Sequence, residues 1–436
     1  VSDELRFLVG DGSNSAGVSV PLSDSDFEWT QWTYLVGTYN GTHTKIYLDG
    51  LLKNTSTDFS GDIDTVGNKL GIGSRSPSSL PFNGSIDEVF ILNRSLSPEQ
   101  INASYQAGLA NHSVQTVVSQ ETAKGENWTC AVTPNDGYED GTTKTSNNVL
   151  IQNTAPTHDT PVLNATDHPD NKTTANLTVY SQNIADADDD SITNITDWRI
   201  DGSSMAVLNM PFETNNNSTD TGAIRDYSTY ENNGTLVNTL VWTDEGRTGG
   251  GYKFNGNEEG ISIGDDNSLS ITNSGLTISV WVKPTSTSEN SAQQALIYKG
   301  GTSDSNDGYR LHGDRASGYY EWWVSNGTER THAHSNVGSW SADEWTHVVA
   351  VCDRETDKTR VYINGGDDTA GSYDCPVGLI NDTSTLYVGY YPSRSWNGTI
   401  DEVKIYNRTL TSEQINASYQ AGLANHSVQT IVSQET

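Results

Sequence analysis

Short runs in which apolar and polar residues alternate fill most of the chain, and clusters of Gly, Asn, Asp and Ser separate them. Examples are TKIYLDG from Thr44, GLTISVWVKP from Gly275 and TRVYING from Thr359. A two-residue period is typical of strands that bury one face, and the clusters are typical of turns. Since each such strand needs a second layer over its apolar face, the pattern predicts an all-β chain of packed antiparallel sheets.

One stretch of sequence occurs twice. INASYQAGLANHSVQTVVSQET begins at Ile101 and returns, with one substitution, at Ile415. The preceding run, FNGSIDEVFILNRSLSPEQ from Phe82, aligns at the same spacing with WNGTIDEVKIYNRTLTSEQ from Trp396. Repetition at a fixed spacing is typical of tandem arrays. The second copy stops at Thr436 where the first one continues, so we expect this chain to be a window cut from a longer array.

Each copy also carries the signals of one short helix. A hydroxyl residue is followed three positions later by Gln, in SPEQ and in TSEQ, which is typical of a helix N-terminus. Gly108 and Gly422 supply a stop signal. We therefore predict helices over 98–107 and 412–421.

The longer copy resembles the laminin-G-like, concanavalin-A-like jelly-roll domain of many microbial surface proteins. VLNMPFE, GGGYKFNGNEEGISIG, LTISVWVKP and NGTIDEVKIYNRTL occur in the order of that family. The resemblance implies two antiparallel sheets packed face to face over 205–424. The shorter copy has no equivalent of the residues before about 317, so we expect it to lack half of the sandwich, including the LTISVWV strand. The matching positions are Phe212, Asp226, Ser228, Asn233, Gly234, Gly251, Phe254, Gly256, Ile261, Trp281, Trp345, His347, Tyr362, Gly365, Gly398, Asp401, Glu402, Val403, Tyr406 and Asn407.

The sequence between the copies resembles immunoglobulin-like domains of archaeal and bacterial surface proteins. NWTCAVTPNDGYEDG resembles their last strands and ADADDDSITNITDWRIDG their first strands, which implies that each jelly roll is inserted into an immunoglobulin-like host. An alternative is one compact sandwich over 112–204. The expected domains are the C-terminal half of a jelly roll (1–111), closing immunoglobulin-like strands (112–154), opening strands of the next host (155–204), a complete jelly roll (205–424) and the start of closing strands (425–436), which should lie beside 155–204.

Composition and charge narrow the set of partners. The chain has 436 residues, of which 33% are hydrophobic. No apolar run approaches the roughly 20 residues that a membrane-spanning helix needs, so we expect a soluble protein. Acidic residues outnumber basic ones by 56 to 24, for a formal net charge of −32. Electrostatic repulsion therefore excludes nucleic acid and anionic membranes as partners.

Twenty Asn-x-Ser/Thr sequons indicate the compartment. An acceptor must be exposed where the transferase reaches it, so this density predicts an extracellular, cell-surface protein coated with N-linked glycans. The alternative is that a chain rich in Asn, Ser and Thr forms sequons by chance. The acceptors are Asn40, Asn54, Asn83, Asn93, Asn102, Asn111, Asn127, Asn164, Asn171, Asn176, Asn194, Asn216, Asn217, Asn233, Asn326, Asn381, Asn397, Asn407, Asn416 and Asn425.

The three cysteines fit an exported protein. Cys352 and Cys375 both fall in the complete jelly roll, and the shorter copy has neither, so we expect them to form a disulfide. Free buried thiols are the alternative. Cys130 has no mate in this sequence, and we expect it to pack as a small apolar group.

Calcium is the one cofactor that the sequence suggests. In the jelly-roll family a calcium ion often lies near an early Asp and the late Gly-x-Ile-Asp-Glu strand. The resemblance thus implies Asp226 and Asp401 as ligands, with Asp87 in the shorter copy; alternatively these acids accept hydrogen bonds from turn amides. A second candidate is the acidic run Asp186, Asp188, Asp189 and Asp190, because hard cations prefer clustered carboxylates, although such a run is also typical of a solvated turn.

We expect no enzymatic activity. A glycosidase on this fold needs two carboxylates about 5 to 10 Å apart across a groove. The only pairs of interest, Asp87 with Glu88 and Asp401 with Glu402, are adjacent in sequence and should point to opposite faces of their strand. The His residues are scattered, and His332 and His334 are expected in a solvated loop.

Two functions fit these features. The first is a structural or adhesive surface protein, a heavily glycosylated tandem-repeat stalk or fibre whose partners are further copies of the repeat or neighbouring fibre subunits. The alternative is a carbohydrate-binding lectin-type module of an adhesin. The aromatic residues available to a lectin site, or else to the sandwich core, are Tyr319, Tyr320, Trp322, Trp323, Tyr390, Tyr391 and Trp396.

Overall fold

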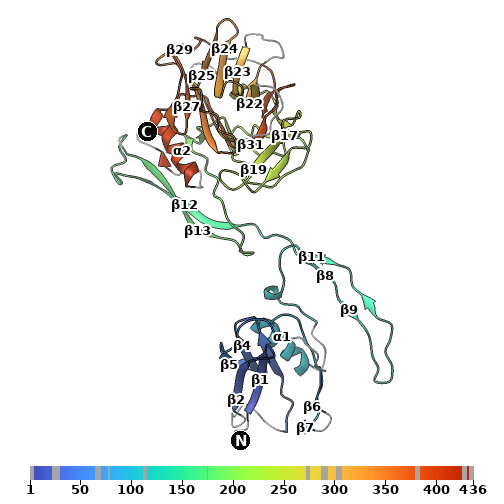
Figure 1. Cartoon of the computed structure of the whole chain (residues 1–436). Helices are drawn as coiled ribbons and strands as arrows, with labels where there is room; N and C mark the ends of the chain where they lie inside the picture. Colours follow the sequence, from blue (N-terminus) through green and yellow to red (C-terminus); the bar gives the residue numbers. More distant parts are fainter. Residues whose placement is uncertain are drawn as a thin grey trace. The chain divides into compact units, whose positions relative to one another are not determined.

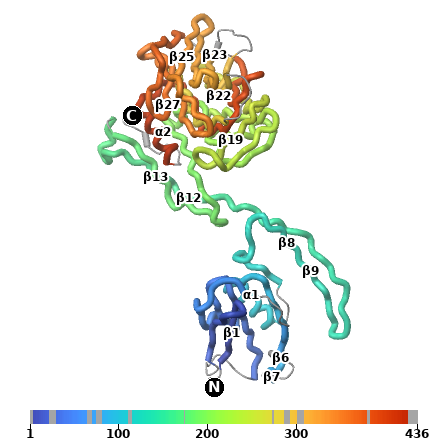
Figure 2. Tube along the Cα trace, viewed as in Figure 1, coloured from blue at the N-terminus to red at the C-terminus, as the bar shows by residue number. Residues whose placement is uncertain are grey.

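The computed structural model is almost entirely β and divides into two compact units, Val1–Ala155 and Pro156–Thr436. The division into five domains expected from the sequence stays a prediction. The structure describes residues 4–21, 30–63, 70–76, 79–110, 115–173, 175–271, 275–285, 293–300, 307–378, 383–424 and 430–431. Figure 1 labels the elements, and Figure 2 follows the chain from end to end.

The second unit contains two large antiparallel sheets, as expected for a jelly roll. One has the order β18-β19-β31-β21-β26-β27-β28, with β16 paired to β31 and β29 to β27. Its strands are β16 (Leu208–Met210), β18 (Val241–Thr243), β19 (Gly251–Asn255), β21 (Leu276–Pro284), β26 (Thr346–Asp353), β27 (Lys358–Ile363), β28 (Gly366–Asp367), β29 (Tyr373–Asp374) and β31 (Asn397–Tyr406).

The other sheet has the order β17-β20-β30-β22-β23-β24-β25 (Figure 1). Its strands are β17 (Gly234–Val237), β20 (Gly260–Ile263), β22 (Gln293–Lys299), β23 (Asp307–Asp314), β24 (Tyr319–Asn326), β25 (Arg330–His334) and β30 (Leu386–Val388), and a 3-10 turn, η2 (Asn267–Leu269), follows β20.

Alternating side chains of both sheets form one core between them. On β24, Tyr320, Trp322 and Val324 are buried in this core, so Tyr319, Glu321 and Trp323 lie on the opposite face of the sheet. The core continues through β21 and β31, whose inward side chains are fully buried. The doubled aromatics of the YYEWWV run thus divide between the core and the outer surface.

Both predicted helices are present and each extends two residues further than expected. They are α1 (Pro98–Leu109) and α2 (Ser412–Leu423). The Thr411 hydroxyl accepts the Gln414 backbone N–H at 3.3 Å, and the Gln414 side chain accepts the Thr411 N–H at 2.6 Å, which completes a capping box. Gly422 is not a stop signal, because it lies inside α2 against the Trp281 indole, where a Cβ would come within 2.5 Å of a ring carbon.

The shorter copy, in the first unit, forms only part of a sandwich. A small core joins Val18 and Val20 to Ile46 and Leu48. Residues 83–93, whose counterparts form β31, make no strand here, which corrects the strand expected from their sequence. The strands of this copy are β1 (Glu4–Gly10), β2 (Ser15–Pro21), β3 (Leu35–Tyr39), β4 (Thr44–Leu48), β5 (Leu51–Ser56), β6 (Ser74–Ser76) and β7 (Ser79–Pro81).

Residues 115–155 form a narrow ribbon instead of a packed layer. It contains η1 (Ser119–Glu121) and two short ladders: β8 (Asn127–Trp128) with β11 (Val149–Leu150), and β9 (Ala131–Val132) with β10 (Lys144–Thr145). Cys130 lies in this ribbon and is exposed, so the expectation that it packs as an apolar group is wrong. Residues 129–150 of the ribbon are all exposed, so no second described layer covers that part of it.

The segment before the jelly roll forms a long hairpin of β12 (Thr157–Ala165) and β13 (Leu177–Ala185), with a short ladder of β14 (Arg199–Ile200) and β15 (Ser203–Ser204) beyond it. Near the C-terminus, β32 (Thr430–Ile431) pairs antiparallel with Leu177 and Thr178 of β13. This is the neighbour expected for the segment from 425. The assignment of these strands to immunoglobulin-like hosts remains a prediction.

Candidate glycan-binding face and candidate metal sites

A row of polar and aromatic side chains crosses the outer face of the seven-stranded sheet. The pairing register places His332 opposite Trp323, Trp323 opposite Arg310, Arg310 opposite Tyr298 and Tyr298 opposite Tyr387. Directly paired residues point to the same side of a sheet, so five adjacent strands contribute one side chain each. At about 4.8 Å per strand the row is about 19 Å long. We call these residues, with Tyr319, Glu321, His312, His334, Arg330, Gln293, Asp314, Tyr391 and Arg394, the aromatic face.

Ring stacking fixes the side chains of this face. The Trp323 and His332 rings are stacked with centroids 4.1 Å apart, and Tyr319 and His334 are stacked at 4.7 Å. The Tyr298 ring is buried and lies 4.2 Å from that of Tyr391. His332 and His334 therefore belong to a strand and to a packed aromatic surface, and the expectation of a solvated loop is wrong.

A buried carboxylate lies at the centre of the face. Glu321 accepts hydrogen bonds from Gln293 Nε2 at 2.8 Å and Trp323 Nε1 at 3.2 Å, and His332 Nε2 lies 3.1 Å from its other oxygen. Burial alone would raise the pKa of Glu321, but the bonds from His332 and Trp323 outweigh it and lower that pKa. Glu321 is therefore ionised at neutral pH and orients the donors around it.

His312 lies on the other side of Glu321 in the same row of the sheet. Burial lowers the pKa of His312 to about 4, so the ring is neutral at pH 7. Sequence reasoning missed both Glu321 and His312. The signal that could have found them is alternation: YRLHGD on β23 and YYEWWV on β24 place every second residue, including His312 and Glu321, on one face.

The structure divides the seven aromatic residues proposed for a lectin site. Tyr320, Trp322 and Trp396 are buried in the core and are not available to a ligand. Tyr319, Trp323, Tyr390 and Tyr391 are partly exposed outside it. The aromatic face therefore keeps three of the seven, Tyr319, Trp323 and Tyr391, and adds histidine and arginine side chains to them.

The Asp226 carboxylate accepts hydrogen bonds that hold a turn together. One of its carboxylate oxygens accepts the backbone N–H groups of Asn209 at 2.8 Å and Ser228 at 2.9 Å. The other accepts the Ser228 hydroxyl at 2.6 Å and the Asn232 N–H at 2.8 Å. Four donors occupy the acceptor positions that a cation would need, which matches the alternative role in binding turn amides.

Asp401 lies in a buried group of carboxylates. Its oxygens accept the backbone N–H groups of Arg247, Thr248 and Glu402 at 2.7, 2.9 and 2.7 Å. Glu402 is also buried and pairs with Lys404, and it lies at a bulge opposite β21 with a φ of 50°. The two acids thus do not point to opposite faces of a regular strand, as their adjacency had predicted.

Glu213 completes this group. Its Oε2 accepts the Gly250 N–H at 3.0 Å, while its Oε1 and Glu402 Oε1 are buried without a hydrogen-bond partner. Burial, and then the negative charge of Glu402, raise the pKa of Glu213 to about 7. Burial and Glu402 also raise the pKa of Asp401. Hard, unpartnered oxygens of this kind fit a divalent cation in donor chemistry.

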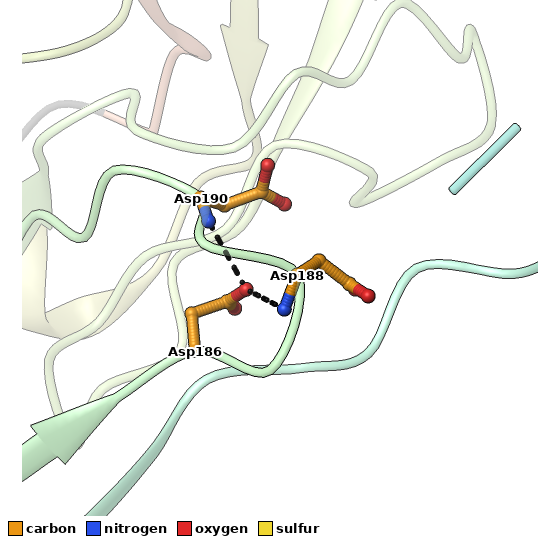
Figure 3. Close-up of side chains that lie close together, drawn as sticks. All are labelled: Asp186, Asp188 and Asp190. Carbon is orange, nitrogen blue, oxygen red and sulfur yellow. Dashed lines mark hydrogen bonds between the residues drawn. The ribbon is translucent and has the colours of Figure 1, made fainter. Parts of the chain in front are cut away.

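The acidic run after β13 forms a single turn, shown in Figure 3. The Asp186 carboxylate accepts the backbone N–H groups of Asp188 at 2.8 Å and Asp190 at 3.2 Å. Carboxylate oxygens of these three residues all lie within 4.8 Å of one another, and among the described residues no other group of three His, Cys, Asp or Glu side chains does so. The turn amides already explain the position of Asp186, and exposed acids cluster in this way without metal.

The remaining predicted site residues are placed as follows. Asp87 is exposed and accepts the Glu88 N–H at 2.9 Å, as Asp401 does from Glu402. Cys352 and Cys375 form a disulfide with a Cα–Cα distance of 5.3 Å. Of the sequon residues, Asn111, Asn381 and Asn425 lie outside the described part of the chain, and none of the described ones is buried.

Comparison with known proteins defines the fold family. The sequence profile of the concanavalin A-like lectin/glucanases superfamily, laminin-G type, matches residues 1–102 and 255–416, more than half of the chain. No curated protein matches. Among the described residues, no helix is long and apolar enough to cross a membrane.

Solved structures with local similarity are receptor-binding domains of toxins. The binding domain of Paraclostridial Mosquitocidal Protein 1 is 17% identical, with 49% of this chain and 51% of that one covered and a TM-score of 0.39. The botulinum neurotoxin serotype D ligand-binding domain, solved with N-acetylneuraminic acid, is 16% identical, with 50% of each chain covered and a TM-score of 0.39. The chain thus spans about half the length of each structure. By the profile match, the chain belongs to the concanavalin A-like lectin/glucanases superfamily.

Proposed function

We propose that the second unit binds carbohydrate through the aromatic face and that the chain is an adhesive part of an extracellular repeat protein. The observation that carries this proposal is the row His332, Trp323, Arg310, Tyr298 and Tyr387 on five adjacent strands. Four of these side chains are partly exposed, and the buried Tyr298 contacts Arg310 and Tyr391. Sugar rings present apolar C–H faces and hydroxyl rims. A surface of fixed aromatic rings interleaved with charged donors matches both kinds of group.

The preorganised state of the face supports binding. Side chains already held by stacking and by Glu321 lose little conformational entropy when a ligand arrives, so more of the interaction energy appears as affinity. Trp323 is central to this arrangement, because its ring lies between β23 and β25 and its Nε1 donates to Glu321.

The rest of the chain fits a surface role. The described sequon residues are exposed or half-buried, which supports N-linked glycans as a coat. The repeated copies support further copies of the same repeat as partners within a stalk or fibre. Glycopeptide mass spectrometry of the native protein tests the coat: modification of most sequons is expected, and occupancy below about a quarter of them would contradict it.

A glycan array probed with the intact chain, produced without N-glycans, tests the proposed binding. We expect selective binding that Trp323→Ala weakens at least tenfold, since stacking and the Glu321 anchor are both lost. Trp32→Ala is the matched control, because Trp32 is an exposed tryptophan in the first unit. Binding that is equally sensitive to both variants, or no binding to any glycan, would contradict the proposal.

A calcium ion held by Asp401 together with one of its buried neighbours, Glu213 or Glu402, is a second part of the proposal. It is supported by the two unpartnered buried oxygens of Glu213 and Glu402. An ion that binds only the folded state stabilises it by mass action, so a chelator should lower the melting temperature. Asp401→Asn should abolish that response and Asp188→Asn should leave it intact. An unchanged melting temperature with chelator would exclude the ion.

A further inference from the structure

Positive charge collects on the aromatic face although the chain as a whole is strongly acidic. The sequence holds 24 Lys and Arg against 56 Asp and Glu. Nevertheless Arg310, Arg330 and Arg394 all lie at this face, each over an aromatic ring. Among the described side chains of β22–β25, the carboxylates are those of Glu321 and Asp314, and both are buried.

These two carboxylates are already engaged. Glu321 is bonded to Gln293, Trp323 and His332, and Asp314 accepts the Ser317 N–H at 2.9 Å. Buried and bonded carboxylates cancel less of the positive potential at the surface than exposed ones would. The exposed guanidinium groups of Arg330 and Arg394 therefore dominate the charge that an approaching ligand meets.

Stacking also fixes how the guanidinium groups are presented. The Arg330 guanidinium lies 4.1 Å from the Trp323 centroid and that of Arg310 lies 4.7 Å from the Tyr298 centroid. The Arg394 group lies 6.0 Å from the Tyr391 centroid, and its Nη1 donates to Gln293 Oε1 at 2.8 Å. A guanidinium held over an aromatic ring can still donate its N–H groups to a planar anion such as a carboxylate, or to sulfate oxygens.

From this arrangement we infer that the carbohydrate bound by the aromatic face is an anionic one, which carries carboxylate or sulfate groups. The inference rests on the proposed glycan-binding function and adds the ligand class to it. The rings provide the surface for the sugar backbone, and the flanking arginines pair with its charged substituents. A neutral polysaccharide would offer no charged group to the exposed guanidinium groups of Arg330 and Arg394 and would bind more weakly.

The test is a titration of the intact chain, prepared without N-glycans, at about 0.15 M NaCl, where interactions between separated surface charges are largely screened. The probes are polygalacturonate for carboxylates, dextran sulfate for sulfates and dextran as the neutral reference. We expect at least one anionic polymer to bind at least tenfold more tightly than dextran. Comparison of the two anionic polymers identifies which anion is preferred.

Variants that remove one positive charge each show which arginines bind the anionic polymer. Arg330→Gln and Arg394→Gln should each weaken binding of the preferred polymer about tenfold, the loss expected for one charge-assisted contact. Arg225→Gln is the matched control, because the Arg225 guanidinium also lies over a tyrosine, Tyr227, at 4.6 Å but is not part of this face. Thermal unfolding of each variant shows that it is folded.

Two results would overturn the inference. Equal affinity for dextran and for both anionic polymers would show a glycan site without charge selectivity, and the proposed function would stand. Equal losses for Arg225→Gln and Arg330→Gln would show non-specific attraction by the whole chain. If dextran, both anionic polymers and every glycan of the array fail to bind, the proposed function fails as well, so the two failures are distinguishable.

Discussion

The two copies of the repeat place nearly the same sequence in two different environments. Ile400 and Ile405 of the second copy lie in β31 and are fully buried, whereas their counterparts Ile86 and Ile91 are 48% and 70% exposed and belong to no strand. In the second copy β31 pairs with β16, β19 and β21. Strand formation in this run therefore depends on neighbours that are far away in sequence.

Features that depend only on nearby sequence are the same in both copies. Glu88 and Glu402 have φ values of 49° and 50°. The Asp49 carboxylate accepts the Tyr34 N–H at 2.9 Å, and the Asn364 side chain accepts the His347 N–H at 3.0 Å. Tyr105 and Tyr419 of the two helices stack on these same positions, at 6.3 and 6.1 Å. The backbone conformation at this Glu, the turn contact and the docking of the helix are thus retained in both copies, while sheet completion is not.

Equivalent Ile-to-Ala substitutions in the two copies should therefore have unequal effects on the free energy of unfolding. Ile405→Ala removes a buried side chain and should lower the free energy of unfolding of the second copy by about 2–5 kcal/mol. Ile91→Ala should change that of the first copy by less than about 0.5 kcal/mol, because the side chain is already in water. Urea unfolding of the full chain, monitored by hydrogen exchange mass spectrometry, measures the free energy of unfolding of each copy separately. Equal losses would show that residues 83–93 are buried in solution.

The disulfide should stabilise one copy only. It closes a loop with a sequence separation of 23 residues in the second copy, and the first copy has no cysteine at these positions. The double variant Cys352→Ala/Cys375→Ala should lower the free energy of unfolding of the second copy by about 3 kcal/mol. In hydrogen exchange mass spectrometry, the double variant should protect the peptides from residues 30–60 of the first copy as well as the unmodified protein does. A matching loss in the first copy would contradict this account.

The two helix glycines should respond with opposite signs. Gly422→Ala places a Cβ within 2.5 Å of the Trp281 indole and should cost about 1–3 kcal/mol. No described atom lies within 4 Å of a Cβ at Gly108, so Gly108→Ala should stabilise α1 by up to about 1 kcal/mol. Thermal unfolding of the two single variants measures both. Stabilisation by both substitutions would mean that α2 does not press on Trp281.

The smallest expected effect concerns pH and Glu213, which has no counterpart in the first copy. Burial raises its pKa to about 7 in the folded state, against 4.5 in the unfolded chain. The folded state therefore binds more protons between these values, and stability is lost as pH rises through about 7. In the presence of chelator, Glu213→Gln should reduce the fall in melting temperature between pH 5 and pH 8. An identical fall in both proteins would show that Glu213 is ionised without cost.

Sequence alone predicted what depends on local pattern: strands such as Leu276–Pro284, both helices and the laminin-G-like sandwich. It predicted that the first copy lacks the strand equivalent to Leu276–Pro284, but not that the run with Ile86 and Ile91 then forms no strand and leaves both side chains exposed. Among site residues, Trp323 was expected as a lectin aromatic, but Glu321 was not. Its role arises only when β24 pairs with β25 and brings His332 within 3.1 Å.

The central claim is that carbohydrate binds on the aromatic face of the second unit. Hydrogen exchange of the full chain, with and without a saturating amount of the polysaccharide that binds most tightly, tests it directly. Peptides from β22 to β25, and above all 319–334, should exchange more slowly when the polysaccharide is bound, while peptides from the first unit should be unchanged. Slower exchange confined to the first unit, or to β16, β19 and β31 of the opposite sheet, would contradict the claim.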